Sequence, residues 1–313
     1  MGTDRPRVPS SPVVLCAVAS SAARIRERFG DLEIVDISQG VPPGLHGDVL
    51  FGGWGPHAVA AMATGVQWVQ LAGTGIDGVP PEVRAAPILT SARGASAVAI
   101  GEYVLAVMGA FARNFPENWL HAPPERWNFQ PATVLAGATL GLFGFGGIAQ
   151  RVARIAVAME MEVVALRRRD LPSPVAGVEM VSDLEALVSR ADHLVLAAPS
   201  TDRTRHVVDA TSLALVRPGL HLVNIARGAL VDHEALRRAL DDGTVARASL
   251  DVTDPEPLPE GHWLFTHPKV FLTPHASWVG PPLFEKATEI FCDNLDRYRA
   301  GEPLDGEVGA EGY

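Results

Sequence analysis

The sequence predicts an α/β protein built from two doubly wound parallel sheets, one in each of two domains. Short apolar runs alternate with helical stretches along all 313 residues. One series of alternations ends before a proline-rich stretch at 115–131, and a second series starts at Ala138. Strands that alternate with helices pair in parallel, with helices on both faces of the sheet. The length is enough for two domains, each with its own core.

The first series of elements opens with an apolar run, PVVLCAVA at 12–19, that is typical of a buried strand. Strands are expected at 12–19, 32–37, 48–51 and 66–71, and helices at 22–29 and 57–64. A longer helix is expected over 97–114. Because it is too apolar for a simple surface helix, it should pack between domains or between subunits.

The second series of elements continues the same pattern to the end of the chain. Strands are expected at 139–143, 163–166, 193–198, 220–225, 248–251 and 270–273. Helices are expected at 212–216 and 282–299, and three further helices are expected to end at 159, 189 and 243. Ser182 and Glu185 have the spacing of a capping box, so we expect Ser182 to cap the helix that ends at Ser189. We expect Asp232 to cap the helix that ends at Gly243.

Composition excludes several classes of protein. Lys plus Arg number 26 and Asp plus Glu 36, and the resulting formal net charge of −10 repels nucleic acids and anionic membranes. Two distant cysteines, Cys16 and Cys292, give neither a disulfide framework nor a zinc site, which favours a reducing compartment. Residues 1–11 lack the order of a signal peptide, and the apolar run 95–112 is interrupted by Glu102 and two glycines. We expect a soluble, cytoplasmic protein that binds no nucleic acid, membrane or metal.

A glycine-rich turn lies directly after the strand expected at 139–143 and directly before a helix. It reads Gly144-Phe145-Gly146-Gly147-Ile148-Ala149. The first glycine permits the tight turn, the second lets a pyrophosphate approach the backbone, and the helix N-terminus offers free N–H groups to the phosphates. Glycines also end strands for structural reasons alone. The strand–turn–helix context nevertheless favours a dinucleotide-binding site.

The residues after the next strand predict which dinucleotide binds. Sites for NAD usually have Asp or Glu there for the ribose hydroxyls. Here the strand at 163–166 ends in Arg167, Arg168 and Arg169. Guanidinium groups bind a 2′-phosphate bidentately, so this turn favours NADP(H) over NAD(H). The alternatives are a solvated basic turn, or a ribose contact from Asp170.

Three polar segments each follow a predicted strand of the second series. They are 224–232 (NIARGALVD), 251–257 (DVTDPEP) and 272–277 (LTPHAS). The carboxyl ends of strands in an open α/β sheet are where ligands bind. Arg227, Glu256 and His275 could each be an ordinary surface or loop residue. Together, and after a dinucleotide turn, they predict a catalytic set.

With these segments the chain resembles the D-isomer-specific 2-hydroxyacid dehydrogenase family over nearly its whole length. The resemblance also includes the turn 73–77, the stretch 98–105 with Glu102, and Pro199-Ser200-Thr201 with Thr204. It implies a flavodoxin-like substrate domain formed by 1–94 and 281–313. A Rossmann domain at 95–280 is inserted in it, and the active site lies between the two.

The resemblance assigns a role to each residue of the catalytic set. Arg227 matches the arginine that binds the substrate carboxylate and polarises the keto oxygen. His275 matches the general acid that protonates this oxygen, and the base in the reverse reaction. Glu256 matches the partner of that histidine, because a carboxylate beside an imidazole stabilises its protonated form.

The resemblance also assigns binding residues. Backbone N–H groups of Thr74 and Gly75 match a loop that holds the substrate carboxylate, together with Arg227 and His275. Asp251 matches the residue that orients the nicotinamide amide, while the cofactor itself carries the hydride. The cofactor-binding set expected is Gly144, Phe145, Gly146, Gly147, Ile148, Arg167, Arg168, Arg169, Pro199, Thr204, Ala226, Asp251 and His275.

The function most consistent with these residues is reduction of a small 2-oxo acid by NADPH to the D-2-hydroxy acid, as in glyoxylate/hydroxypyruvate reductases. Alternatives are a dinucleotide-sensing, corepressor-like protein on the same scaffold, or a dehydrogenase of this family with another substrate, such as phosphite. A homodimer is expected, because the helix over 97–112 and the loop with Trp119 and Trp127 would bury well across a two-fold axis. Trp54 and Trp278 either line the pocket or pack as ordinary aromatic residues.

Overall fold

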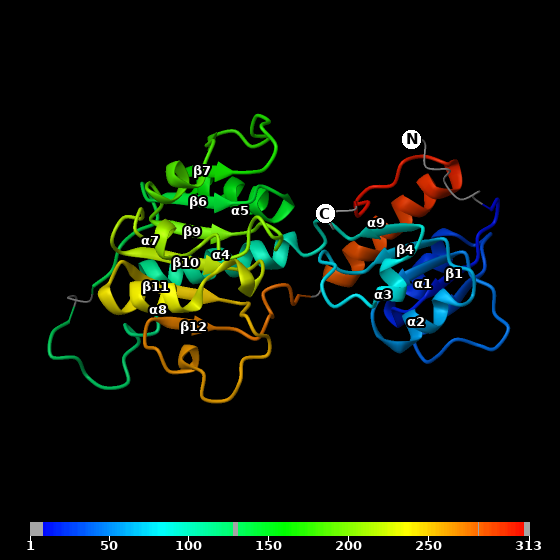
Figure 1. The fold of residues 1–313 in the computed structure, drawn as a ribbon, viewed down its shortest axis with the longest axis horizontal. Helices are drawn as coiled ribbons and strands as arrows, with labels where there is room; N and C mark the ends of the chain where they lie inside the picture. Colours follow the sequence, from blue (N-terminus) through cyan, green and yellow to red (C-terminus); the bar gives the residue numbers. More distant parts are fainter. Residues whose placement is uncertain (1–8, 128–130, 281, 310–313) are drawn as a thin grey trace. The chain divides into compact units, whose positions relative to one another are not determined.

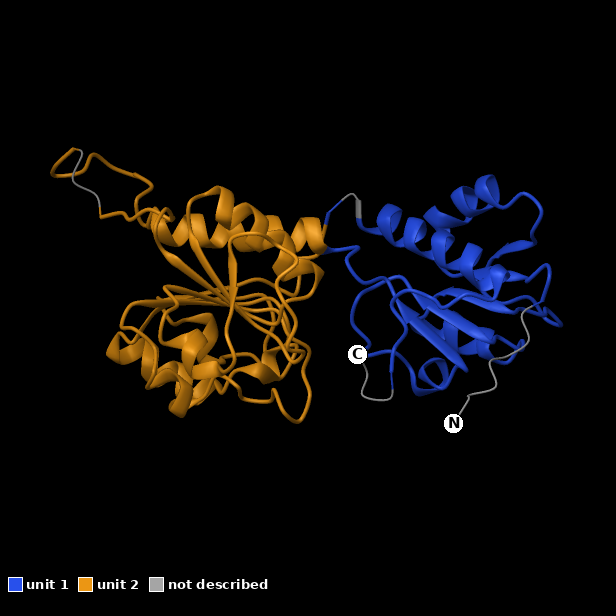
Figure 2. Ribbon diagram, turned by 90° about the horizontal axis from the view of Figure 1, so that it is seen from above, with its two compact units in different colours: residues 1–96, 280–313 blue, residues 97–279 orange. Residues whose placement is uncertain are grey.

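The chain folds into two units, each built on one all-parallel sheet, as Figure 2 shows in two colours. The computed structural model describes residues 9–127, 131–280 and 282–309. Contacts divide the chain into unit 1, residues 1–96 with 280–313, and unit 2, residues 97–279. The sequence places the domain boundaries at 94/95 and 280/281. Residues 128–130 of the predicted proline-rich loop, residue 281 and the two ends of the chain lie outside the described part.

Unit 1 contains five short strands in the order β2-β1-β3-β4-β5, which is the flavodoxin-like order. Figure 1 labels β1 and β4 of this sheet. Its strands are β1 (Val14–Cys16), β2 (Ile34–Asp36), β3 (Val49–Gly52), β4 (Trp68–Leu71) and β5 (Ile88–Ser91). Its helices are α1 (Ala19–Arg28), α2 (Gly55–Met62), α3 (Pro81–Arg84) and α9 (Pro282–Ala300).

Side-chain alternation along the strands explains the layers of unit 1. Val14, Phe51 and Trp68 point to one face of the sheet and pack against apolar residues of α1 and α9. Leu15 and Val69 point to the other face, beneath α2 and α3. The strands are buried on both faces and therefore read as continuous apolar runs.

Unit 2 contains seven parallel strands in the order β12-β11-β10-β9-β6-β7-β8, a Rossmann order extended by one strand. Its strands are β6 (Thr139–Phe143), β7 (Glu162–Leu166), β8 (Val178–Met180), β9 (His193–Leu196), β10 (Leu220–Asn224), β11 (Val245–Leu250) and β12 (Val270–Leu272). Its helices are α4 (Ala97–Ala112), α5 (Gly147–Ala158), α6 (Leu184–Val188), α7 (Ala210–Leu213) and α8 (His233–Asp242), with the short 3₁₀ helices η1 (Gly228–Leu230) and η2 (Trp263–Phe265).

The sheet of unit 2 is also covered on both faces. Apolar residues of α4 and α5 pack on one face around Leu142 and Val223. Those of α6, α7 and α8 pack on the other face around Leu194 and Leu222. The predicted fold class, a Rossmann domain inserted in a flavodoxin-like domain, is confirmed.

Some local predictions differ from the structure. The cap of α6 is Asp183, whose carboxylate accepts a hydrogen bond from Ala186 N at 2.8 Å, while Ser182 only donates to Asp183. Ser182 is therefore not the cap, because the Asp183 carboxylate one residue on already binds the free N–H. The helix expected at 212–216 begins instead at Ala210, where Asp209 and Ser212 form a capping box. Asp232 and Gly243 do bound α8 as predicted.

Two strands, β5 and β8, were not expected from the sequence. Each is three or four residues long and lies at the edge of its sheet. β8 reads VEM and is only partly buried, so it lacks the apolar run by which the other strands are recognised. In the part of the chain that the structure describes, no helix combines the length and apolarity needed to cross a bilayer.

Candidate active site

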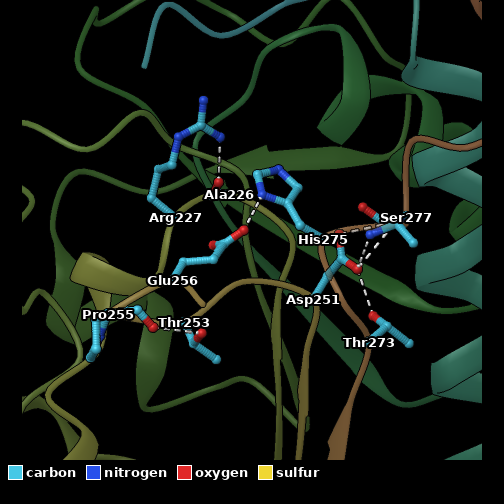
Figure 3. A network of polar contacts seen from close by, with 10 residues as sticks. Ala226, Arg227, Asp251, Thr253, Pro255, Glu256, Thr273, His275 and Ser277 are labelled. Carbon is cyan, nitrogen blue, oxygen red and sulfur yellow. Dashed lines mark hydrogen bonds and ion pairs between the residues drawn. The ribbon is translucent and has the colours of Figure 1, made fainter. Parts of the chain in front are cut away.

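The three polar segments that follow β10, β11 and β12 meet at one edge of the sheet of unit 2. These strands are neighbours and run parallel, so their carboxyl ends emerge on the same side. Figure 3 shows the loops after them, which carry Arg227, Glu256 and His275. The sheet order thus brings together residues that are up to 48 positions apart in the sequence (275 minus 227).

His275 and Glu256 form a hydrogen-bonded pair. The Nδ1 atom of His275 lies 2.6 Å from Glu256 Oε1, and 40% of each side chain is exposed to solvent. Nδ1 is engaged by the carboxylate, so Nε2 is the ring nitrogen that remains to exchange a proton with a ligand. The arrangement is a histidine oriented by a carboxylate, which is a common acid–base unit.

The backbone of His275 has a conformation that few non-glycine residues adopt. Its φ angle is +52°, in the left-handed region. The N–H of His275 donates to the carbonyl oxygens of Asp251 at 2.8 Å and Thr273 at 3.0 Å. These bonds fix the tight turn that turns the imidazole toward Glu256 (Figure 3).

Asp251 binds the loop that carries His275. Its carboxylate is 1% exposed and accepts hydrogen bonds from Thr273 Oγ1 at 2.5 Å, Ala276 N at 2.8 Å and Ser277 N at 3.0 Å. A buried carboxylate is costly unless donors compensate its charge, and these donors do so. The predicted contact of Asp251 with the nicotinamide amide remains a prediction.

Arg227 lies in a loop held by Asn224, a residue for which the sequence predicts no role. The Asn224 side chain is buried, accepts from Ala226 N at 3.1 Å and donates to the carbonyl of Arg227 at 2.9 Å. Arg227 itself donates from Nη1 to the carbonyl of Ala226 at 2.6 Å. The next residue, Gly228, has no room for a Cβ atom, which would lie 1.9 Å from the backbone of Thr253. This close approach joins the arginine loop to the loop of Glu256.

The glycine-rich turn after β6 has the geometry of a phosphate cradle. Gly144 has φ +95°, and a Cβ there would lie 2.7 Å from the backbone of Ala197 and Ala198. A Cβ on Gly146 would instead meet nothing within 4 Å. Within the described residues the N–H groups of Gly147 and Ile148 have no hydrogen-bond acceptor. Open space beside free N–H groups at a helix N-terminus fits a pyrophosphate.

The arginines follow β7, which pairs with β6. Arg167 donates from Nη2 to the carbonyl of Pro172 at 2.9 Å. Its Nε atom is buried and has no hydrogen-bond partner among the described residues. Arg168 and Arg169 are exposed. A buried guanidinium N–H without an acceptor, beside two exposed arginines, fits an anionic group of the ligand.

Pro199 and Thr204 lie after β9, on the other side of β6. The hydroxyl of Thr204 donates to the carbonyl of Pro199 at 2.7 Å and accepts from Thr201 N at 2.8 Å. These bonds fix the loop at the point where the strand order reverses, which is where open α/β sheets bind ligands. Pro199, Thr204 and the turn of Gly144 are therefore at the same edge.

Thr74 and Gly75 belong to unit 1, in the loop after β4. The hydroxyl of Thr74 donates to the carbonyl of Ala92 at 3.3 Å. In the described part of the chain the N–H groups of Thr74 and Gly75 have no acceptor. The ring of Trp54, 38% exposed, lies against Gly73, where a Cβ would be 3.0 Å from its Cη2. The assignment of Thr74 and Gly75 to the substrate remains a prediction.

The sequence profile of the NAD-binding domain of D-isomer specific 2-hydroxyacid dehydrogenases matches residues 105–277, more than half of the chain. The chain belongs to this family. Members of the D-2-hydroxyacid dehydrogenase family are oxidoreductases that bind a nicotinamide dinucleotide in this domain. Among the described residues no group of three or more His, Cys, Asp or Glu side chains could hold a metal ion.

Relatives in the family act on different acids. This chain is 33% identical over 244 residues to the D-3-phosphoglycerate dehydrogenase of Methanocaldococcus jannaschii, covering 76% of this chain and 46% of that protein. It is 36% identical over 214 residues to the (S)-sulfolactate dehydrogenase of Chromohalobacter salexigens, covering 66% and 68%. The chain thus spans about half of the length of the first of these relatives. Their names do not agree on a substrate.

A solved structure with the same fold is the NADPH-dependent glyoxylate/hydroxypyruvate reductase from Sinorhizobium meliloti, in complex with NADP and sulfate. The TM-score is 0.79 over 97% of this chain and 100% of the reductase chain. The identity of 23% shows likeness of fold alone.

Proposed function

We propose that this dehydrogenase reduces a small 2-oxo acid, of the glyoxylate or hydroxypyruvate type, to the D-2-hydroxy acid with NADPH. The observation that carries the proposal is the His275–Glu256 pair, with Nδ1 and Oε1 2.6 Å apart. The pair lies at the sheet edge from which the loop of Arg227 also emerges. An acid–base pair beside an arginine suits a substrate that has a keto group next to a carboxylate.

Each residue of the set has a defined part in this reaction, and Arg227, besides binding the carboxylate, polarises the keto oxygen. Two N–H groups of the Arg227 guanidinium bind the substrate carboxylate, and Thr74 and Gly75 add backbone N–H groups. His275 donates a proton from Nε2 to the keto oxygen, and Glu256 stabilises the imidazolium before that transfer. When bound, the reduced nicotinamide supplies the hydride. In the oxidative direction His275 takes the proton back.

The choice of NADPH rests on the turn after β7. No carboxylate ends that strand, and Arg167, Arg168 and Arg169 follow it directly. The buried Nε of Arg167 has no acceptor among the described residues, which supports an anionic ligand group here. The residues that would hold the rest of the cofactor are Gly144, Phe145, Gly146, Gly147, Ile148, Pro199, Thr204, Ala226, Asp251 and His275.

The test is a nicotinamide absorbance assay with purified protein. NADPH and NADH are offered separately with glyoxylate, hydroxypyruvate, pyruvate and sulfopyruvate. We expect oxidation of NADPH with glyoxylate or hydroxypyruvate, and much less oxidation of NADH. If the protein turns over another of these acids preferentially, the proposed substrate is wrong and the proposed type of reaction stands.

Two variants separate an enzyme from a dinucleotide-sensing protein. His275→Ala and Arg227→Ala should each lower turnover at least about 100-fold, because each removes a group that acts on the reacting carbonyl. In Arg227→Ala the NADPH affinity, measured by fluorescence titration, should change less than about threefold, and His275→Ala should still bind NADPH. If wild type binds NADPH but reduces none of the four acids, the catalytic assignment is wrong and the sensing alternative gains support.

The homodimer is the corresponding proposal for assembly. The loop after α4 exposes large apolar side chains: Trp119 is 58% exposed, Leu120 48% and Trp127 68%. Such a group is typical of an interface that buries it. Light scattering should give twice the chain mass, and a monomer in solution would rule out this proposal.

A further inference from the structure

We propose that Tyr103, on α4, is a positioning residue for His275. Through Thr273 and Asp251 its hydroxyl holds the loop that carries the imidazole. The proposal deepens the proposed function and rests on it only for the role of His275. The contacts themselves lie within unit 2 and join three segments, the helix α4, the end of β11 and the loop after β12.

The hydrogen bonds of this chain of residues have a defined direction. Thr273 Oγ1 lies 2.5 Å from Asp251 Oδ1, and an ionised carboxylate only accepts, so the hydroxyl proton of Thr273 points to Asp251. Tyr103 Oη lies 2.9 Å from the same Thr273 oxygen. Since the single proton of Thr273 is already used, Tyr103 is the donor. Burial raises the pKa of the Tyr103 phenol, which keeps it protonated for this task.

The far end of this chain of hydrogen bonds holds the two residues that follow His275. Asp251 Oδ1 also accepts from Ala276 N at 2.8 Å, and Asp251 Oδ2 accepts from Ser277 N at 3.0 Å. His275 has φ +52°, which a residue with a Cβ seldom adopts without support from its surroundings. A carboxylate that is fixed by Thr273 imposes that turn on both sides of the imidazole (Figure 3).

Tyr103, at the other end of these hydrogen bonds, lies on a helix that packs in the core of unit 2. On α4, Ile100 and Val104 flank Tyr103 and are 7% and 0% exposed in the cluster with α5 and the sheet. Gly101 lets α4 approach α5, because a Cβ there would lie 3.0 Å from Arg151 Cγ. The phenol thus projects from a helix whose position is fixed by packing. It ties the loop after β12 to this helix.

The test compares Tyr103→Phe, Thr273→Val and the double variant with wild type. Tyr103→Phe should lower kcat about three- to tenfold, as expected for one lost hydrogen bond, with KM changed less than about twofold. Thr273→Val should lower kcat at least as much. The double variant should be no worse than Thr273→Val alone, because both substitutions interrupt one chain of bonds. Thr273→Ser keeps the hydroxyl and should retain most of the activity.

A second readout does not depend on turnover. Amide hydrogen exchange of the segment 273–279 should be faster in Tyr103→Phe than in wild type, since Ala276 and Ser277 donate to a less firmly held carboxylate. The matched control is Tyr298→Phe, which removes a buried hydroxyl that has no partner among the described residues. It should change neither kcat nor exchange of the segment.

Two results would overturn the proposal. One is wild-type exchange of 273–279 in Tyr103→Phe, and the other is kcat losses of Tyr103→Phe and Thr273→Val that multiply in the double variant. If the wild-type protein reduces no 2-oxo acid, the proposed function fails, while the exchange experiment still decides whether Tyr103 holds the loop.

Discussion

The charges of individual side chains in the turn after β7 determine whether this turn would attract or repel the 2′-phosphate of NADPH. A guanidinium offers paired N–H donors to a phosphate, whereas a carboxylate at this point would repel it. Arg167 is partly engaged by the carbonyl of Pro172, but its buried Nε is left without an acceptor in the described chain. At this scale the proposed preference for NADPH depends on two or three side chains.

The double substitution Arg167→Gln with Arg168→Gln should therefore weaken NADPH binding at least about tenfold, and NADH binding less than about twofold. Fluorescence titration with each cofactor measures both changes. Arg217→Gln is the control. Arg217 is an exposed arginine that precedes β10, and it lies at the opposite end of that strand from the loop of Arg227. Equal losses for the two cofactors would contradict a role in binding the 2′-phosphate.

At the scale of elements, the strand–turn–helix formed by β6 and α5 uses its glycines for two different purposes. Gly144 serves the fold, because its φ is +95° and the backbone of Ala197 leaves no room for a Cβ. Gly146 has an ordinary φ of −83° and open space beside it. At a helix N-terminus, that space would let a pyrophosphate approach the backbone.

Two alanine substitutions should separate these purposes. Gly144→Ala should destabilise the protein by about 1–3 kcal/mol, because it strains the turn and pushes two strands' loops apart. Gly146→Ala should cost no more than about 1 kcal/mol, the loss expected for Ala in place of Gly at a helix N-cap. It should nevertheless weaken dinucleotide binding about tenfold or more. Urea unfolding and cofactor titration of both variants test this, and full affinity in Gly146→Ala would exclude the cradle.

At the scale of the whole molecule, two buried histidines at the other end of the unit 2 sheet should make the stability depend on pH. His193 and His221 lie with their Nδ1 atoms 3.0 Å apart, and His221 Nε2 is 2.9 Å from Ser249 Oγ. The ring of Phe111 stacks on His221 at 4.5 Å. Burial lowers the pKa of His193 to about 4 and the pKa of His221 well below its usual value.

The folded protein should therefore lose stability as the pH falls. Below about pH 6.5 the unfolded chain binds protons at these histidines and the folded chain does not, so proton binding stabilises the unfolded state relative to the folded state progressively down to pH 4. His193 alone should contribute about 2–3 kcal/mol over this range. Urea midpoints measured from pH 7 to pH 4 should fall less steeply in His193→Gln than in wild type. His121→Gln, at an exposed loop position, should follow wild type; a steep fall that persists in His193→Gln would contradict the assignment.

Patterns that are local in the chain already contain much of the architecture. Runs such as 12–19 specify strands buried on two faces, the Gly144 turn marks where a strand passes into a helix, and Asp232 with Gly243 bounds α8. These features depend on residues that are close together in the sequence, so they can be recognised from the sequence alone. The edge strands β5 and β8 are not, because pairing with a neighbour, and not apolarity, makes them strands.

Contacts between distant segments could be decided only by the tertiary structure. Tyr103 and Thr273 are 170 residues apart, and nothing near either residue in the sequence indicates their hydrogen bond. The same holds for Gly228, which is a glycine because the backbone of Thr253 passes beside it. The types of residue that carry chemistry can be read from the sequence, because side-chain chemistry is a property of each residue. How firmly they are held depends on packing and hydrogen bonds that arise only when the sheet brings its loops together.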